Sequence, residues 1–166
     1  MLIGVISDTH NDIEGIKNAV DFFNLRCADL VLHCGDIFSP FAAKEFAGLR
    51  CGFKAVYGNN DIEQAELENI ISEFGMIQPA PFEFKVSGKL FVMMHKPFNL
   101  GTMANSGKYD FILYGHLHRA GIEKIGKTIV LNPGEASGQR FGIKTVALID
   151  LLSGHNEIFE LLSFCC

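Results

Sequence analysis

Hydrophobic segments typical of β-strands recur along the first two thirds of the chain, and each one ends at a polar side chain of a particular kind. These segments are LIGVIS (2–7), LVLHC (30–34), FKAVY (53–57), LFVMM (90–94) and FILYG (111–115). The residues that follow them are, in order, Asp8 and His10, Asp36, Asn59, His95, and His116 and His118. Because the carboxyl ends of parallel strands meet at one edge of a sheet, the pattern predicts a single crevice that gathers these side chains.

Helical patterns separate the first strands from one another. Asn11 and Glu14 form a possible capping box, which predicts a helix start after the first strand. Ser39 and Pro40 are typical of an N-cap and a first helical residue, and a third helix is expected over 63–74. Three successive β-α units favour a parallel sheet with right-handed crossovers.

The pattern changes after residue 82. Segments 82–86 and 89–95 flank Ser87-Gly88 and predict a hairpin, and a short helix is expected near 100–106. Beyond His118 the segments GIEKI, TIVL, TVALID and EIFELL, separated by turns, predict a meander of strands. We therefore expect an α/β protein with two facing sheets and one domain over residues 1–166.

Composition narrows the classes of function. The 166 residues are 48% hydrophobic and carry a formal charge of -5, which disfavours a protein that neutralises the phosphates of long nucleic acid. No apolar run has the length of a membrane span, and the N-terminus does not have the pattern of a signal peptide. Five cysteines without a Cys-x-x-Cys pair favour reduced thiols. A cytoplasmic enzyme is the expectation.

The seven polar side chains at the strand ends are a mixed set of oxygen and nitrogen ligands without sulfur, which suits Mn, Fe, Ni or Zn. Seven ligands are enough for two divalent cations. These cations carry four positive charges, whereas Asp8 and Asp36 supply only two negative charges. A water shared by the metals would deprotonate near neutral pH and attack phosphorus in line. Hydrolysis of phosphate esters is the reaction predicted.

Five sequence blocks resemble the calcineurin-like metallophosphoesterases, in particular their small single-domain prokaryotic phosphodiesterases. The blocks are Asp8-Thr9-His10, Gly35-Asp36, Gly58-Asn59-Asn60-Asp61, His95 and Gly115-His116-Leu117-His118. The resemblance implies a four-layer αββα sandwich. It also implies one metal held by Asp8, His10, Asp36 and His118, and another held by Asp36, Asn59, His95 and His116. Asp36 would bridge two divalent ions, with Mn or Ni expected first and Fe or Zn as alternatives.

Two departures from the family pattern affect the expected chemistry. Many relatives have a histidine at the position of Asn60, where it assists the leaving group; an asparagine donates a hydrogen bond but transfers no proton. A second histidine that commonly follows the His95 block is replaced by Lys96-Pro97. Asp36 and Asn60 are the candidate catalytic residues, and the leaving group is expected to receive less help.

The sequence leaves alternative functions open. A phosphomonoesterase or nucleotide phosphatase would use the same metals, and the fold also serves as a protein-binding scaffold in a retromer subunit. The resemblance further implies a homo-oligomer, a dimer or tetramer. We expect His33 to be a core residue with one satisfied nitrogen and His155 to be a turn residue. Asn132-Pro133-Gly134 is typical of a plain turn, whereas the resemblance implies that this loop lies near the site, where Asn132 would orient a ligand histidine.

Overall fold

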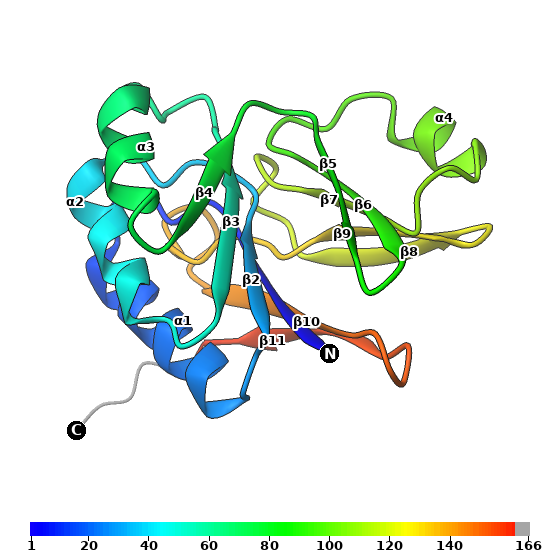
Figure 1. Ribbon diagram of the computed structural model, residues 1–166, viewed down its shortest axis with the longest axis horizontal. Coiled ribbons are helices and arrows are strands. Elements are labelled where there is room, and N and C mark those ends of the chain that lie inside the picture. The colour runs from blue at the N-terminus through cyan, green and yellow to red at the C-terminus, as the bar shows by residue number, and fades with distance from the viewer. Residues whose placement is uncertain (162–166) are drawn as a thin grey trace.

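Two β-sheets face each other in the computed structural model, which describes residues 1–161 (Figure 1). The strands of the first sheet are β1 (Leu2–Ile6), β2 (Leu30–His33), β3 (Gly52–Val56), β4 (Gly75–Gln78), β10 (Thr145–Asp150) and β11 (Asn156–Glu160). Their order is β11-β10-β1-β2-β3-β4. Strands β1 to β4 run parallel, so that their carboxyl ends share one edge.

The second sheet contains five strands in the order β5-β6-β7-β9-β8. They are β5 (Phe82–Val86), β6 (Lys89–Met94), β7 (Phe111–Tyr114), β8 (Gly121–Ile125) and β9 (Thr128–Asn132). Strands β6, β7 and β9 run parallel, whereas the edge strands β5 and β8 are antiparallel to their neighbours. The ends of β6 and β7 thus bring His95 and His116 to the edge shared with the first sheet.

The helices lie on the two outer sides of the sheet pair (Figure 1). On the first sheet are α1 (Ile13–Leu25), α2 (Pro40–Ala43), the 3-10 helix η1 (Lys44–Gly48) and α3 (Gln64–Ile71), and on the second is α4 (Leu100–Asn105). Ser39 caps α2, because its Oγ accepts from the Ala42 N–H at 3.3 Å, as the sequence predicts.

Three hydrophobic clusters fill the spaces between these layers. Along β1, Ile3 and Val5 point to the core between the sheets, whereas Ile6 packs under the helices. Along β6, Met93 faces the inter-sheet core and Val92 contacts the layer under α4. Because side chains alternate along a strand, sheets buried on both faces produce the continuous apolar runs seen in the sequence. The predicted αββα sandwich is confirmed.

Two local predictions are wrong, and one strand was not predicted. The capping box fails because Asn11 adopts a left-handed φ of 60° and Asp12 is the N-cap of α1. The unpredicted strand is β4, a short edge strand in which Ile77 is the buried residue. The expected meander is two hairpins: β8 and β9 complete the second sheet, whereas β10 and β11 cross to the first.

Within residues 1–161, no helix combines the length and the apolar character needed to cross a bilayer. Cys27, Cys34 and Cys51 have free thiols. Cys165 and Cys166 lie outside the described residues. The single domain over 1–166 stays a prediction.

Candidate metal centre

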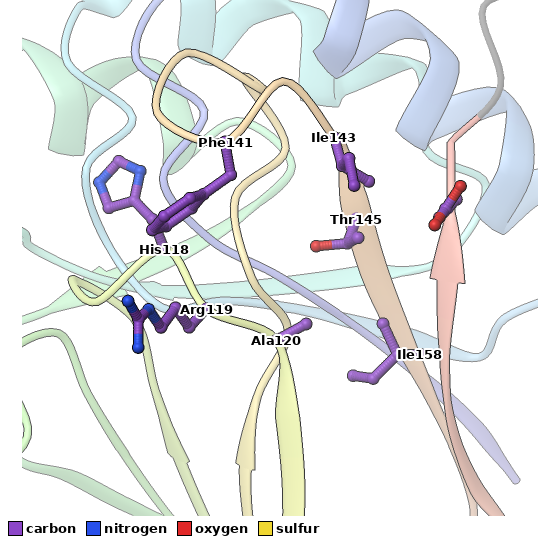
Figure 2. A pocket seen from close by; sticks show the side chains of 8 residues that line it. His118, Arg119, Ala120, Phe141, Ile143, Thr145 and Ile158 are labelled. Atoms are coloured by element: carbon purple, nitrogen blue, oxygen red, sulfur yellow. The ribbon is translucent and has the colours of Figure 1, made fainter.

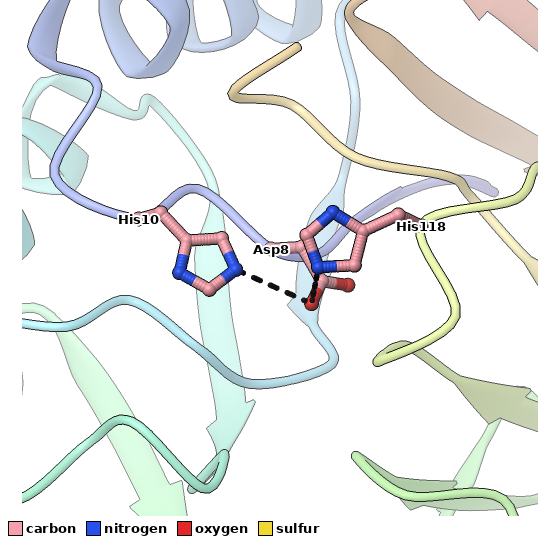
Figure 3. A group of neighbouring side chains, drawn as sticks. All are labelled: Asp8, His10 and His118. Carbon is pink, nitrogen blue, oxygen red and sulfur yellow. Dashed lines mark ion pairs between the residues drawn. The ribbon is translucent and has the colours of Figure 1, made fainter. Parts of the chain in front are cut away.

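Carboxylates and imidazoles from both sheets converge at the shared edge. Asp8, which follows β1, lies between His10 and His118 (Figure 3). Its Oδ1 is 3.7 Å from His10 Nε2 and 3.3 Å from His118 Nε2. The two rings stack with centroids 5.2 Å apart, so both present nitrogen to the same carboxylate oxygen.

Asp36, which follows β2, occupies the middle of the cluster. Its Oδ2 is 3.6 Å from His10 Nε2 and 3.2 Å from His95 Nε2. Asn59 approaches the same nitrogen of His95, with its Oδ1 3.2 Å from Nε2. One carboxylate therefore faces imidazoles from two groups of residues, the position that a bridging ligand requires.

His116 approaches the cluster in a different way. Its backbone N–H donates to Asp8 Oδ2 at 3.0 Å, and its ring lies edge-on to His95 with centroids 5.1 Å apart. Burial, together with neighbouring His95 and Lys96, lowers the pKa of His116. A neutral imidazole beside His95 is the form that binds a cation.

The backbone at the strand ends is held in the left-handed region. Positive φ values of 42° to 68° occur at Asp8, His10, Asp36, His116 and His118. Side chains other than glycine rarely adopt this conformation, and such strain accumulates at functional sites. A Cβ on Gly58 would clash with Asp36, which explains the glycine that precedes Asn59.

Two buried ligand atoms of the centre have no hydrogen-bond partner among the described residues. They are Asp8 Oδ1 and His10 Nε2. Burial opposes ionisation of Asp8, but His10 and Ser7 outweigh it and hold the pKa of the carboxyl below its usual value. Burial likewise opposes ionisation of Asp36, yet His95 and Asn60 lower its pKa. The carboxylate of Asp8 raises the pKa of His10.

These observations fit a centre for divalent cations. Two groups have ligand atoms within 4.8 Å of one another: Asp8, His10 and His118, and Asp8, Asp36 and His95. Ionised carboxylates beside imidazoles are the donor set expected for Mn, Fe, Ni or Zn, and a cation would satisfy the atoms left unpaired.

Comparison with known proteins agrees with this geometry. The sequence pattern of the calcineurin-like phosphoesterase superfamily domain matches residues 1–154. The chain belongs to this superfamily. It is 36% identical over 159 residues to Phosphodiesterase MJ0936 of Methanocaldococcus jannaschii, covering 90% of this chain and 93% of that protein. A probable metallophosphoesterase of Methanothermobacter thermautotrophicus is 28% identical, over 90% of this chain and 85% of its own.

Solved structures extend the comparison. The structure of an archaeal phosphodiesterase superposes with a TM-score of 0.91 at 34% identity, over 97% of this chain and 100% of that one. A mutant Vps29 of Entamoeba histolytica superposes with a TM-score of 0.70 at 19% identity, over 98% and 100%. The second match shows the fold alone. As a calcineurin-like phosphoesterase, the chain belongs to a family of metal-dependent phosphoric ester hydrolases.

The phosphoesterase domain supports its histidines with groups that sequence reasoning missed. Glu135, only 1% exposed, lies 2.8 Å from His118 Nδ1 through its Oε2. The backbone N–H groups of Arg140 and Phe141 also donate to this carboxylate. His95 Nδ1 lies 2.9 Å from the carbonyl oxygen of Cys34. Such partners orient a ligand ring so that its other nitrogen faces the metal.

Asn60 and Asp61 hold the central loops of the phosphoesterase domain together. The backbone N–H and Nδ2 of Asn60 both donate to Asp36, each at 2.8 Å. Asp61 accepts from the N–H groups of Asp36, Phe38 and Gly58. The only signal in the sequence was the position of Asp61 directly after the Gly-Asn-Asn block.

Other candidates lie where the sequence predicts or nearby. His33 is a core residue, with both nitrogens satisfied instead of one. Asn132 is near the site, but its Nδ2 donates to the carbonyl oxygen of Gly115, so it supports the backbone before His116 and not a histidine ring. His155 lies exposed beside a turn.

A pocket of about 490 Å³ adjoins His118 on the outer side of the centre (Figure 2). Arg119, Phe141, Ile143 and Ile158 are among its lining residues. The guanidinium carbon of Arg119 is 5.6 Å from the Phe141 ring centroid, and that of Arg140 is 5.7 Å from the same centroid.

Proposed function

We propose that this phosphoesterase hydrolyses small phosphodiesters with two divalent cations held at the edge shared by the sheets. The observation that carries the proposal is the convergence of two carboxylates and three imidazoles, in which two buried ligand atoms lack hydrogen-bond partners among residues 1–161. These residues are Asp8, Asp36, His10, His95 and His118. Similarity to an archaeal phosphodiesterase over nearly the whole chain supports a diester substrate.

We assign the ligands to two overlapping sets. Asp8, His10, Asp36 and His118 would hold one cation, and Asp36, Asn59, His95 and His116 the other. The position of Asp36 Oδ2 near both His10 and His95 supports its role as the bridge. Mn or Ni fits this oxygen and nitrogen set best, with Fe or Zn as alternatives. When bound, such cations neutralise phosphoryl oxygens and acidify the attacking water.

Residues of the chain prepare the centre for this chemistry. Glu135 holds His118 by Nδ1, and the Cys34 carbonyl holds His95 by Nδ1, so that each Nε2 faces a carboxylate. Asn60 donates to Asp36 and has no acidic proton for a departing alkoxide. The leaving group must therefore carry more of its own negative charge.

Metal analysis tests the two-cation centre directly. Protein stripped with a chelator and reconstituted with Mn or Ni is expected to retain two equivalents per chain, because six ligands beside Asp36 exceed what one ion uses. At most one tightly held equivalent would refute the proposal.

A substrate screen tests the reaction. Metal-dependent hydrolysis of bis-aryl phosphates faster than of the matching aryl monophosphates is expected for a phosphodiesterase. The reverse preference would favour the phosphomonoesterase alternative, and metal binding without turnover would favour a scaffold.

We also propose a cytoplasmic homo-oligomer, a dimer or tetramer. Exposed apolar side chains such as Phe41, 66% exposed, and Leu152, 90% exposed, provide surface for association. Light scattering at micromolar concentration should give a mass of at least two chains, and a monomer would contradict this.

A further inference from the structure

A smaller pocket opens beside the centre, on the side of Asn60. Its volume is about 290 Å³, and it is lined by Asn11, Phe38, Ser39, Asn60, Ile62 and Glu63. We name it the Phe38 pocket. Two contacts join it to the metal centre: the Phe38 ring centroid lies 6.4 Å from that of His10, and Asn60 Nδ2 donates to Asp36. A group attached to a phosphate at the centre can reach it.

The backbone of Phe38 is strained. Its φ is 89°, which crowds the Cβ of any residue other than glycine and is a clear outlier for a bulky side chain. A hydrogen bond of 2.6 Å from its N–H to Asp61 Oδ1 holds this conformation. Since strained positions persist where the surroundings impose them and cluster at ligand sites, Phe38 qualifies for a role at the site.

The ring of Phe38 is only partly buried by the protein. The residue is 44% exposed, and its neighbour in the pocket, Ile62, is 82% exposed. Removing two adjacent apolar side chains from water favours a flat apolar ligand, and aromatic rings stack with centroids roughly 4.5 to 7 Å apart. The pocket therefore offers a stacking platform next to the phosphate position.

Charge further restricts the ligand. Glu63 is exposed at the pocket, and the chain has a formal charge of -5. The amide and hydroxyl groups of Asn11, Ser39 and Asn60 are the other polar groups of the lining, and they carry no positive charge. A second phosphate would be repelled here by Glu63, whereas an uncharged ring would not be repelled.

We propose that the Phe38 pocket binds the leaving group of the phosphodiester and selects an uncharged planar ring, such as an aryl group or the base of a nucleoside, stacked on Phe38. This inference rests on the proposed phosphodiesterase function and adds the class of substituent that the enzyme prefers. Phe38 is then a specificity-determining residue.

A pair of leucine variants tests the proposal by kinetics. Phe38→Leu removes the ring, and Phe41→Leu makes the same change at an exposed residue that does not line the pocket. Each is assayed, with wild type, on methyl 4-nitrophenyl phosphate and on methyl trifluoroethyl phosphate. Comparing each variant with wild type on one ester removes the intrinsic reactivity of that ester.

Phe38→Leu is expected to lower kcat/KM about tenfold for the aryl ester and less than about twofold for the alkyl ester, as loss of one stacking contact implies. Phe41→Leu should change neither. Equal losses on both esters in Phe38→Leu would overturn the proposal.

A binding measurement tests whether the Phe38 pocket holds a planar ring, without depending on turnover. The chain contains no tryptophan, so Phe38→Trp introduces a single reporter while keeping an aromatic platform. Adenosine, an uncharged nucleoside, should quench this fluorescence saturably in the metal-loaded protein, and Phe41→Trp should show no saturable quenching. No quenching in Phe38→Trp overturns the pocket, whereas the absence of wild-type turnover on every ester overturns the phosphodiesterase function instead.

Discussion

His33 and His10 lie close together and differ in whether their ring nitrogens have hydrogen-bond partners. His33 is fully buried, its Nδ1 accepts from the Gly35 N–H at 3.1 Å, and its Nε2 lies 3.2 Å from Thr9 Oγ1. His10, in contrast, has a buried Nε2 without a hydrogen-bond partner within residues 1–161. A histidine paired on both sides stabilises the fold, whereas an unpaired nitrogen facing carboxylates marks a place for a cation.

Substitution of Asp36, a carboxylate that faces His10, is expected to have the largest effect on turnover. Asp36→Asn removes the charge at the proposed bridge, and we expect turnover to fall at least ~1000-fold because several kcal/mol of charge stabilisation are lost. Asp21→Asn, an exposed change of the same kind on α1, should retain full activity. Circular dichroism and metal analysis accompany the assay. A folded Asp36→Asn variant with near-normal turnover would show that Asp36 is no bridge.

Glu135 contacts a proposed ligand, His118, without being a ligand itself, so its substitution tests the support of the metal centre. Glu135→Gln weakens the partner of His118 Nδ1 while preserving its shape, so the affinity for the cation assigned to the His118 set should fall about 10- to 100-fold. Competition with a chromophoric chelator measures this without any assay of turnover. Glu123→Gln, on the exposed face of β8, is the matched control. Unchanged affinity would mean that His118 needs no partner.

Substitution of Asn60 tests how the enzyme assists the leaving group, apart from how it binds metal. Since asparagine cannot protonate a departing alkoxide, wild-type rates should depend steeply on leaving-group pKa, and Asn60→His should flatten that dependence. Aryl and alkyl diesters assayed on both proteins give the two slopes. Because Asn60 also donates to Asp36, metal content is measured in parallel. A shallow wild-type slope in single-turnover experiments would indicate another acid.

His33 should give the smallest catalytic change. His33→Asn is expected to keep turnover within about threefold of wild type and to lower the free energy of unfolding by about 1–3 kcal/mol, because buried partners lose a hydrogen bond. A folded His33→Asn variant that lost turnover as severely as Asp36→Asn would contradict the separate roles.

The same variant tests the charge state of His33. Burial lowers the pKa of His33 to about 3, so between that value and the ordinary pKa near 6.5 only the unfolded chain binds the proton. Wild-type stability should therefore fall as pH drops through this window. The stability difference from His33→Asn should narrow by about 2 kcal/mol between pH 7.5 and pH 5 in urea titrations. A constant difference would mean that His33 has the same pKa in the folded and the unfolded protein.

The central strands and their polar ends were predictable because both faces of these strands are buried. An apolar run such as LFVMM reports burial directly, and the residue after it marks the carboxyl end. The same reasoning misses β4, where only Ile77 is buried, and it cannot decide which sheet a late hairpin joins. That choice depends on packing between distant segments.

The convergence of the proposed metal ligands was predictable from the sequence, but the groups that support them were not. Glu135 lies 17 positions after His118 in the sequence, and its role arises only when the loop beyond β9 returns to the centre. Asn11 likewise has a helix-capping pattern, yet its N–H donates to the Ile37 carbonyl and its Oδ1 accepts from Ser39. Long-range contacts override the local preference in both cases.

The pairing of β1 with β10 has a consequence for synthesis of the protein. Leu2 lies opposite Asp150, so β1 acquires its second neighbour only after β10 has left the ribosome. Until then β1 exposes an unpaired edge, which invites pairing with other chains. Such distant pairing also slows folding. Nascent chains that stall between residues 118 and 145 should therefore depend on chaperones, although every proposed metal ligand has already been translated.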